Sequence, residues 1–497
     1  MRLDRRTGQG PANPTEMTVS SASRTFAAFS TFTGIATLAA GCAPDAAPLR
    51  STNGIPDASA RLLAEVGFFN VPPQPTAAIY PARLFYVFEP ADTEAEARPL
   101  VVFFNGGPGF ATSAGLLSFG TGRRTVDLAA DAGTTASDNE ARWTRFANLL
   151  YIDARQTGFS YGLGALGDAG TAISEFEDAS DFVRAVLDFL DGHEALRKSP
   201  VILAGESYGG VRATAMLDLL LRYPTEASRG GADLERRIQA HYDLAFPERA
   251  GTVLDPATAA RQFGAQVLIQ PAVLAGQFSL QYLAPASAYA DGSVDPENAL
   301  EPVGWSDTLV SRALQVLADP VQSARLIGSP FDEVALMQPS ARTGAFHEDD
   351  VSDFAGDAGL SNALNQALSS QLGPLSARDR YFALNVSARV PALAAPIGDD
   401  FIENLRTVKT FITNARNDLV VYSPAIPSLL GATIDSSPQP GVARPGSFRV
   451  SLPATDGGEP AQSVTVRFPT YEQSGHMVAA SQPADLAADV QAWWSAR

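Results

Sequence analysis

The segment 205–209, Gly-Glu-Ser-Tyr-Gly, places a serine in the pattern Gly-x-Ser-x-Gly. It follows the apolar run 200–203 and precedes a segment with helical spacing of apolar residues that stops before Pro224. Small residues beside the serine permit a strained turn between strand and helix that lifts the hydroxyl above the sheet. A serine becomes a nucleophile only when a base takes its proton. The pattern therefore predicts Ser207 as a nucleophile, provided the chain supplies a base.

The search for that base is short because the chain has four histidines. His193, His241 and His347 lie in polar or acidic segments, where a solvated surface imidazole is the ordinary interpretation. His476 lies after the last strand-like segment and before the last helix-like segment. A triad built on this kind of turn follows the chain order serine, acid, histidine. We therefore expect His476 to be the base.

The third group should be a carboxylate that fixes the imidazole tautomer and stabilises the imidazolium. Asp418 lies at the end of the strand-like segment TFITNARNDLVV. Asp435 and Asp456 lie in what reads as long polar loops between this segment and the last strand, and they are weaker candidates. The pattern favours Asp418.

An oxyanion needs backbone N–H donors that are already aimed at it. One should come from Tyr208, the residue after the nucleophile. Another should come from the glycine turn after the apolar run 100–104. There, Gly106 and Gly107 let backbone amides approach a substrate closely, and Pro108 stiffens the bend.

Strand-like apolar segments alternate with helix-like segments from about residue 78 to the end of the chain. This alternation indicates an α/β fold with a mostly parallel central sheet that is covered by helices on both faces. Residues 225–264 read as a looser connection. Between residues 277 and 396 the pattern changes to short segments rich in Ala, Asp, Ser and Pro. We interpret that stretch as an insertion that caps the loop edge of the sheet.

The composition limits the possible partners. The formal net charge of −18 over 497 residues argues against general binding to nucleic acid or to anionic membranes, because both reward basic patches. The single cysteine rules out an intramolecular disulfide. The sequence has neither a Cys/His cluster nor a cofactor motif, so we expect no metal and no cofactor.

The N-terminal region resembles a bacterial lipoprotein signal. From Met17 a short basic start leads into the uncharged stretch 25–40 and then to Gly41 and Cys42. We expect residues 1–41 to be a leader and signal peptide, with lipid added to Cys42 and the protein exported to the periplasm or outer cell surface. A disordered tail or an ordinary cleaved signal are the alternatives, and the true start is open between Met1 and Met17. Residues 42–70 read as a tether and residues 71–497 as the catalytic domain.

Taken together, the segments resemble those of the serine carboxypeptidase family. The matching stretches are NGGPG (105–109), DNEARWTRFANLLYIDARQTGFSYG (138–162), GESYGG (205–210), an aspartate followed by an apolar trio (418–421) and GHMV (475–478). The resemblance implies an α/β-hydrolase fold and the removal of C-terminal residues from peptides through an acyl-enzyme.

The resemblance also implies residue roles. Ser207 would be the nucleophile, His476 the base, Asp418 the orienting acid, and the amides of Gly107 and Tyr208 the oxyanion hole. The free carboxylate of the substrate would be held by Asn105, Gly106 and Glu206. A glutamate can hydrogen-bond a carboxylate only when one of the two is protonated, so we expect the best activity at acidic pH.

The chain departs from the family pattern at two positions. Phe103 stands where the family usually has a tryptophan, and Ser118 stands where it usually has a second glutamate. Disulfides common in the family are also missing. Loss of one carboxylate weakens the acidic anchor for a C-terminal carboxylate. A serine esterase or acyltransferase acting on small molecules is therefore the second hypothesis, and a catalytically silent binding lipoprotein is the third. The sequence leaves side-chain preference and oligomeric state open.

Overall fold

The computed structural model describes residues 65–72, 81–106 and most of 111–277 and 395–496. All of these belong to the second of two units, 38–497, into which the chain divides. The expected signal peptide with Cys42, the tether as far as residue 64 and nearly all of the expected cap lie outside the described residues. None of the helices in the described part is long and apolar enough to cross a membrane.

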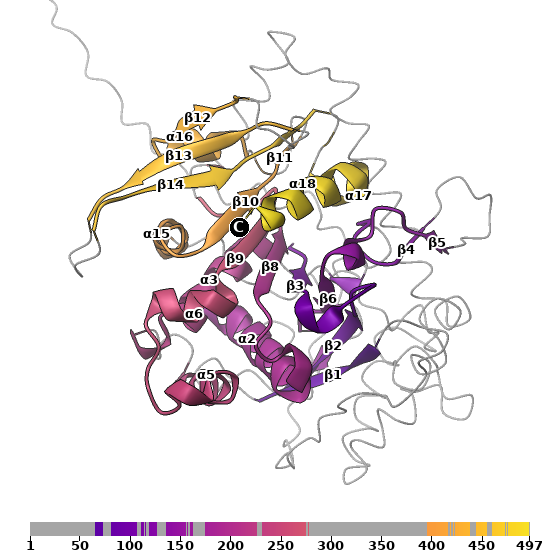
Figure 1. Ribbon diagram of the computed structural model, residues 1–497, viewed down its shortest axis with the longest axis vertical. Coiled ribbons are helices and arrows are strands. Elements are labelled where there is room, and N and C mark those ends of the chain that lie inside the picture. The colour runs from indigo at the N-terminus through magenta and orange to yellow at the C-terminus, as the bar shows by residue number, and fades with distance from the viewer. Residues whose placement is uncertain are drawn as a thin grey trace, which may run out of the picture. The chain divides into compact units, whose positions relative to one another are not determined.

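The described residues form one large mixed sheet of 11 strands (Figure 1). Its central strands are parallel to one another, and its outer strands are antiparallel to their neighbours. The expected α/β fold with a mostly parallel centre is therefore confirmed, with antiparallel edges that the sequence did not predict. In spatial order the strands are β1 (Glu65–Val71), β2 (Ala82–Glu89), β6 (Asn148–Ile152), β3 (Leu100–Phe104), β8 (Val201–Glu206), β9 (Ala265–Ile269), β10 (Lys409–Ile412), β14 (Gln462–Arg467), β13 (Ser447–Leu452) and β12 (Thr433–Asp435), with β7 (Tyr161–Gly162) beside β2.

Four short strands form two separate pairs. They are β4 (Arg124–Val126) with β5 (Ala136–Asp138), and β11 (Asn414–Ala415) with β15 (Thr470–Tyr471).

Helices cover the sheet on both faces. Helix α3 (Gly209–Leu221) packs on β8 and β9 and contacts α2 (Glu175–Gly192) and α15 (Ala395–Asn404). Figure 1 shows β10 between α15 and α18 (Pro483–Ser495). The central strands are buried along their whole length, because a parallel sheet with two covered faces requires apolar side chains on both.

The region 225–264 is not a loose connection. It contains α5 (Ala232–Ala245), a 3-10 turn at Pro247–Arg249 and α6 (Pro256–Phe263). Helix α5 has a polar outer face, which hid it in the sequence, but it buries Leu234, Ile238 and Tyr242 against the core.

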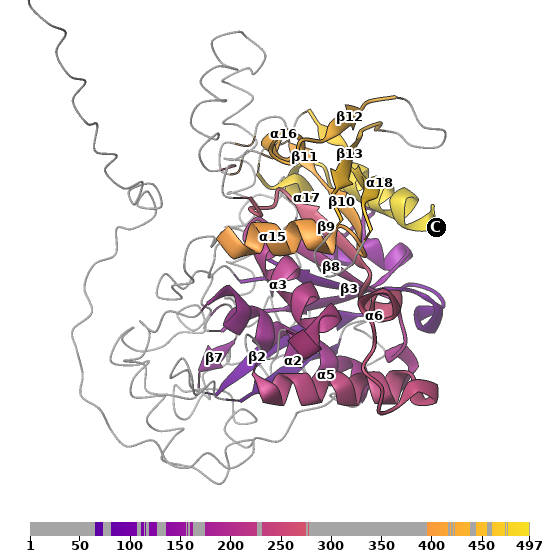
Figure 2. The same cartoon turned by 90° about the vertical axis from the view of Figure 1, so that its left-hand side faces the viewer.

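The polar stretch before the last parallel strand also differs from expectation. Strands β12 and β13 extend the sheet there by antiparallel pairing, and Figure 2 shows them at the end of the sheet away from β2. Asp435 ends β12 with its side chain exposed. Asp456 lies outside the described residues. The half-exposed pattern of β13 gave it too few apolar residues to stand out in the sequence.

The large sheet includes residues that precede the expected domain boundary at residue 71. Strand β1 starts at Glu65, and Phe69 stacks on Tyr86 of β2 with ring centroids 4.3 Å apart. The hydroxyl of Tyr86 donates a hydrogen bond to Glu65 Oε1 at 2.8 Å. The last part of the expected tether is therefore an edge strand.

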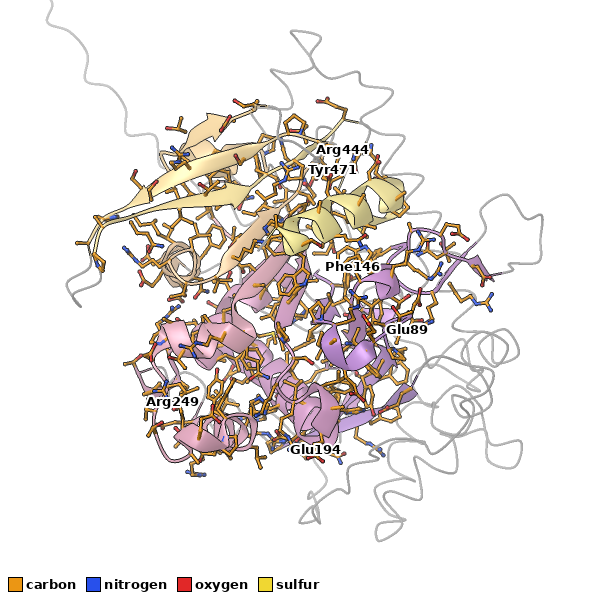
Figure 3. The ribbon with its side chains drawn as sticks, viewed as in Figure 1. Glu89, Phe146, Glu194, Arg249, Arg444 and Tyr471 are labelled. Carbon is orange, nitrogen blue, oxygen red and sulfur yellow. The ribbon has the colours of Figure 1, made fainter. Side chains whose placement is uncertain are left out.

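The segment that leads to His476 is fixed against α18. Tyr471 of β15 donates from its hydroxyl to Asp489 Oδ2 at 3.1 Å. Figure 3 shows Arg444 beside Tyr471, with its guanidinium carbon 5.5 Å from the ring centroid. Arg444 also pairs with Asp485 and Asp489. These contacts hold the chain just before the histidine that the sequence singles out.

We predict that Leu203→Ala destabilises the fold far more than Leu429→Ala. Leu203 is fully buried in β8, so its truncation should cost about 2–5 kcal/mol of the free energy of unfolding. Leu429 ends α16 (Ala425–Leu429) with 41% of its surface exposed, so its truncation should cost less than about 0.5 kcal/mol. Urea unfolding followed by circular dichroism measures both. Equal losses would show that β8 is not at the centre of the core.

Candidate active site

Ser207 stands in the sharp turn between β8 and α3. Its φ is +57°, a left-handed conformation that a residue with a side chain adopts only when its surroundings impose it. A Cβ on Gly205 would lie 2.2 Å from the carbonyl oxygen of Gly209, so this turn requires glycine there. The Ser207 N–H donates to the Ile269 carbonyl at 2.9 Å. The turn therefore has the strained geometry that the Gly-x-Ser-x-Gly pattern predicts.

The structure brings Asp418 and His476 together although 58 residues separate them. The Nδ1 atom of His476 lies 2.9 Å from Asp418 Oδ2. The other oxygen, Oδ1, accepts from the Val421 N–H at 3.0 Å. Asp418 is only 4% exposed. This contact orients the histidine ring with Nε2 facing away from the aspartate.

Gln270 is a residue of this site that the sequence did not reveal. Its side-chain Nε2 donates to Asp418 Oδ2 at 2.7 Å, and its Oε1 accepts from the Ala415 N–H at 2.7 Å. The Thr413 hydroxyl donates to the same Oε1 at 3.1 Å. Gln270 is fully buried and has a φ of +45°. A polar residue directly after the buried strand β9 was the available signal.

On its other side, His476 contacts a second carboxylate. Its Nε2 lies 3.1 Å from Glu206 Oε1. Among the described residues, no hydrogen bond joins the Ser207 hydroxyl to His476. Burial lowers the pKa of His476, but the charges of Asp418 and Glu206 outweigh burial and raise that pKa well above its usual value. The two carboxylates therefore favour the imidazolium form of His476.

The turn at Asn105 and Gly106 lies against the serine turn. A Cβ on Gly106 would be 2.5 Å from Tyr208 N and 2.7 Å from the Ser207 Cβ. Asn105 is 1% exposed, and its side-chain Oδ1 is buried without a hydrogen-bond partner. Its Nδ2 makes only a long 3.5 Å contact with the Ala111 carbonyl. A buried acceptor such as this Oδ1 is costly unless a hydrogen-bond donor engages it.

Of the other site positions named from the sequence, the structure describes two and leaves two undescribed. Gly107 and Ser118 lie outside the described residues. Tyr208 is the N-terminal capping residue of α3, where backbone N–H groups have no partner within the helix. Phe103 is fully buried and packs against Phe119 and Tyr151 with ring centroids 5.7 Å away in each case. It fills the core beneath the turn.

His193 and His241 are not the solvated imidazoles that the sequence suggested. His241 is fully buried between Asp191 Oδ1 at 2.7 Å and Gln262 Oε1 at 3.2 Å. His193 is part-buried, and its Nε2 lies 3.1 Å from Glu65 Oε2. Both histidines lie where one helix or strand packs on another. The polar sequence around each of them does not reveal this packing. His347 lies outside the described residues.

Within the described part of the chain, no group of three or more His, Cys, Asp or Glu side chains is arranged to hold a metal ion.

Comparisons with known proteins identify relatives of part of this chain. The model of the serine carboxypeptidase family matches residues 65–234. Carboxypeptidase sxa2 of Schizosaccharomyces pombe is 34% identical over 143 residues, which are 29% of this chain and 26% of that protein. The lysosomal protective protein of Mus musculus is 28% identical over 149 residues, 29% of each chain. The chain thus matches less than a third of the length of these curated relatives.

Among solved structures, KEX1(DELTA)P, a prohormone-processing carboxypeptidase from Saccharomyces cerevisiae, has a TM-score of 0.47 and 14% sequence identity. That comparison covers 89% of this chain and 93% of the other. The family match includes Asn105 and Ser207 and ends before Asp418 and His476. The similarity to the serine carboxypeptidase family therefore covers residues 65–234 of this chain.

Proposed function

We propose that this protein is a serine carboxypeptidase that removes C-terminal residues from peptides. One observation carries the proposal: a buried row of Asp418, His476 and Glu206 beside a serine in a strained turn. Asp418 and His476 supply an oriented base, which any serine hydrolase requires. The Asn105 Nδ2, which makes only a 3.5 Å contact with the Ala111 carbonyl, and a protonated Glu206 can both donate hydrogen bonds to a free carboxylate, a group that an endopeptidase does not have to bind.

The chemistry would proceed in two halves. The Ser207 oxygen attacks the carbonyl carbon of the last peptide bond while His476 Nε2 takes the hydroxyl proton. The same nitrogen then protonates the leaving amine, so the C-terminal residue departs and an acyl-enzyme remains. Water enters in the second half and regenerates the serine. We assign the oxyanion to the N–H groups of Tyr208 and Gly107.

We assign the substrate carboxylate to Asn105, Gly106 and Glu206. The Asn105 amide and the Gly106 N–H can donate at any pH. Glu206 can donate only when it carries a proton. We propose that in the free protein this proton is held by the adjacent His476, whose Nε2 is 3.1 Å from Glu206 Oε1.

This contact suggests how the substrate prepares the base. When a carboxylate approaches Glu206, two negative groups face each other unless one accepts a proton. Transfer from His476 to Glu206 breaks the Nε2–H bond and forms an O–H bond that donates to the substrate. The same step leaves Nε2 neutral, so it can accept the Ser207 proton. A free C-terminus would thus both anchor the substrate and ready the base.

The peptide substrate and the exported location are also proposals. The family match favours a peptide with a free C-terminus, and one relative is named a lysosomal protein, which favours a location outside the cytoplasm. We further propose a lipid anchor at Cys42, carried by the signal-like segment before it. Labelled palmitate should enter the full chain and not Cys42→Ala. Equal labelling of both would contradict the anchor.

We predict that a fluorophosphonate probe labels Ser207 and that Ser207→Ala loses both labelling and turnover, with kcat falling roughly 10⁶-fold. Active-site titration and hydrolysis of a blocked dipeptide with a free carboxylate measure these effects. Turnover of esters with no turnover of peptides would favour the esterase or acyltransferase. An unlabelled Ser207 would favour the silent binding protein.

We predict opposite pH dependences for two kinds of substrate. For the blocked dipeptide, kcat/KM should fall as pH rises through the raised pKa of His476, because the proton that Glu206 needs is then lost. For the ethyl ester of a blocked amino acid, kcat/KM should rise over the same range, because Nε2 must be free of its proton. Stopped-flow pH profiles measure both.

The variant Glu206→Gln tests the cause of these profiles. It removes one of the two carboxylates that raise the pKa of His476, so the rise for the ester should move to lower pH. Two results would contradict the proposal that His476 and Glu206 share one proton. These are pH profiles with the same slope for both substrates, and an ester profile that does not shift in Glu206→Gln.

A further inference from the structure

Arg212 is a buried arginine directly beneath the turn at Asn105. It lies in α3 and is 1% exposed. Its Nε and Nη2 donate to the two oxygens of Asp178 at 2.8 and 3.3 Å. Its Nη1 donates to the backbone carbonyl of Asn105 at 2.6 Å. One guanidinium therefore joins α2, α3 and the turn that follows β3.

The guanidinium is held rigidly. Phe182 lies one helical turn after Asp178 in α2, and its ring centroid is 4.2 Å from the Arg212 guanidinium carbon. The rings of Tyr208 and Phe104 are 5.4 and 5.7 Å away. Stacking on aromatic faces and a two-point carboxylate contact restrict an arginine more than a lysine, which offers a single point charge.

The carbonyl that Arg212 binds shares a peptide group with the N–H of Gly106. This group is planar and trans, so its oxygen and its N–H point in opposite directions. Fixing the oxygen of Asn105 therefore fixes the direction of the Gly106 N–H. A charged donor on the oxygen also polarises the group and strengthens the N–H as a donor. Within the described residues, no hydrogen bond occupies this N–H.

We propose that Arg212, anchored by Asp178, is a positioning residue for the site that binds the C-terminal carboxylate of the substrate. It orients and polarises the Asn105–Gly106 peptide group so that the Gly106 N–H donates to that carboxylate. The inference rests on the proposed carboxypeptidase function, and neither residue touches the substrate. The alternative role is purely structural, a buried ion pair that joins α2 to α3.

The experiment compares a double variant that removes both charges and a single variant that keeps the positive charge with a control variant. Arg212→Met alone leaves Asp178 buried without its partner, which is strongly destabilising. The double variant Arg212→Met/Asp178→Asn removes both charges and keeps the side-chain sizes similar. Arg212→Lys keeps the charge and loses the fork. Arg184→Met is the control, because Arg184 is also a buried arginine, 4% exposed, but lies in α2 and pairs with Asp233 at 2.8 Å and Asp181 at 3.8 Å.

We expect a change in KM that depends on the substrate. For the blocked dipeptide, the double variant should raise KM roughly 10- to 100-fold, the effect of a lost hydrogen bond to a charged group. Its kcat, its turnover of the ethyl ester and its rate of labelling by the fluorophosphonate should stay within about threefold of the parent. The KM of Arg212→Lys for the dipeptide should lie between that of the parent and that of the double variant. Arg184→Met should leave the KM for the dipeptide and the turnover of the ester unchanged.

Three results would overturn the inference. These are an unchanged peptide KM in the folded double variant, equal losses for peptide and ester, and the same KM change in Arg184→Met. If the double variant does not fold, Arg212→Lys decides by the same split between peptide KM and ester turnover. If the parent protein does not cleave the dipeptide, the proposed function itself fails, and this inference fails with it.

Discussion

The left-handed backbone of Ser207 is the constraint on which the rest of the site depends. A residue with a side chain in this conformation stores about 1–3 kcal/mol of strain. The cost is tolerated because β8 lies between two parallel neighbours, β3 and β9, and because glycine at position 205 lets the chain cross Gly209 closely. The same turn places Glu206, Ser207 and Tyr208 side by side at the end of a rigid strand.

Around that turn, charge is arranged in two buried groups. In one, His476 lies between Asp418 and Glu206, so the charge state of the histidine depends on two acids with different roles. In the other, Arg212 and Asp178 support the backbone of Asn105 from below. Buried charges are stable only when they are paired and hydrogen-bonded. The second group thus offers a fixed support, whereas in our proposal the Glu206 contact of the first is exchanged for the substrate carboxylate.

The sequence predicted the parts of this arrangement that leave a local pattern. The serine turn, the apolar parallel strands and the position of His476 in the chain all show a spacing or a neighbourhood that one segment reveals. Asp418 could be paired with His476 because parallel strands end at one edge of the sheet. Asp178 and Arg212 left no such pattern, and Gln270 left only its position directly after a buried strand. Their importance comes from partners 34 to 148 residues distant, and a buried polar residue resembles a surface one until its neighbours are known.

The sequence did not predict the half-exposed strands and helices, because their local pattern is weak. Strand β13 and helix α5 each bury one face only, so their composition resembles that of loops. Edge strand β1 lies at the end of the segment that reads as a tether, because that segment is rich in Ala, Pro and Ser and shows little periodicity. Elements at the edges of a fold carry less apolar signal than elements at its centre.

The central claim is that this serine site acts on a free C-terminus. Mass spectrometry of a single peptide, offered once with a free C-terminal carboxylate and once as the C-terminal amide, tests it most directly. The account predicts that the free peptide is shortened one residue at a time from its C-terminus and that the amide is shortened far more slowly. Internal cleavage, or equal cleavage of the two peptides, would contradict it.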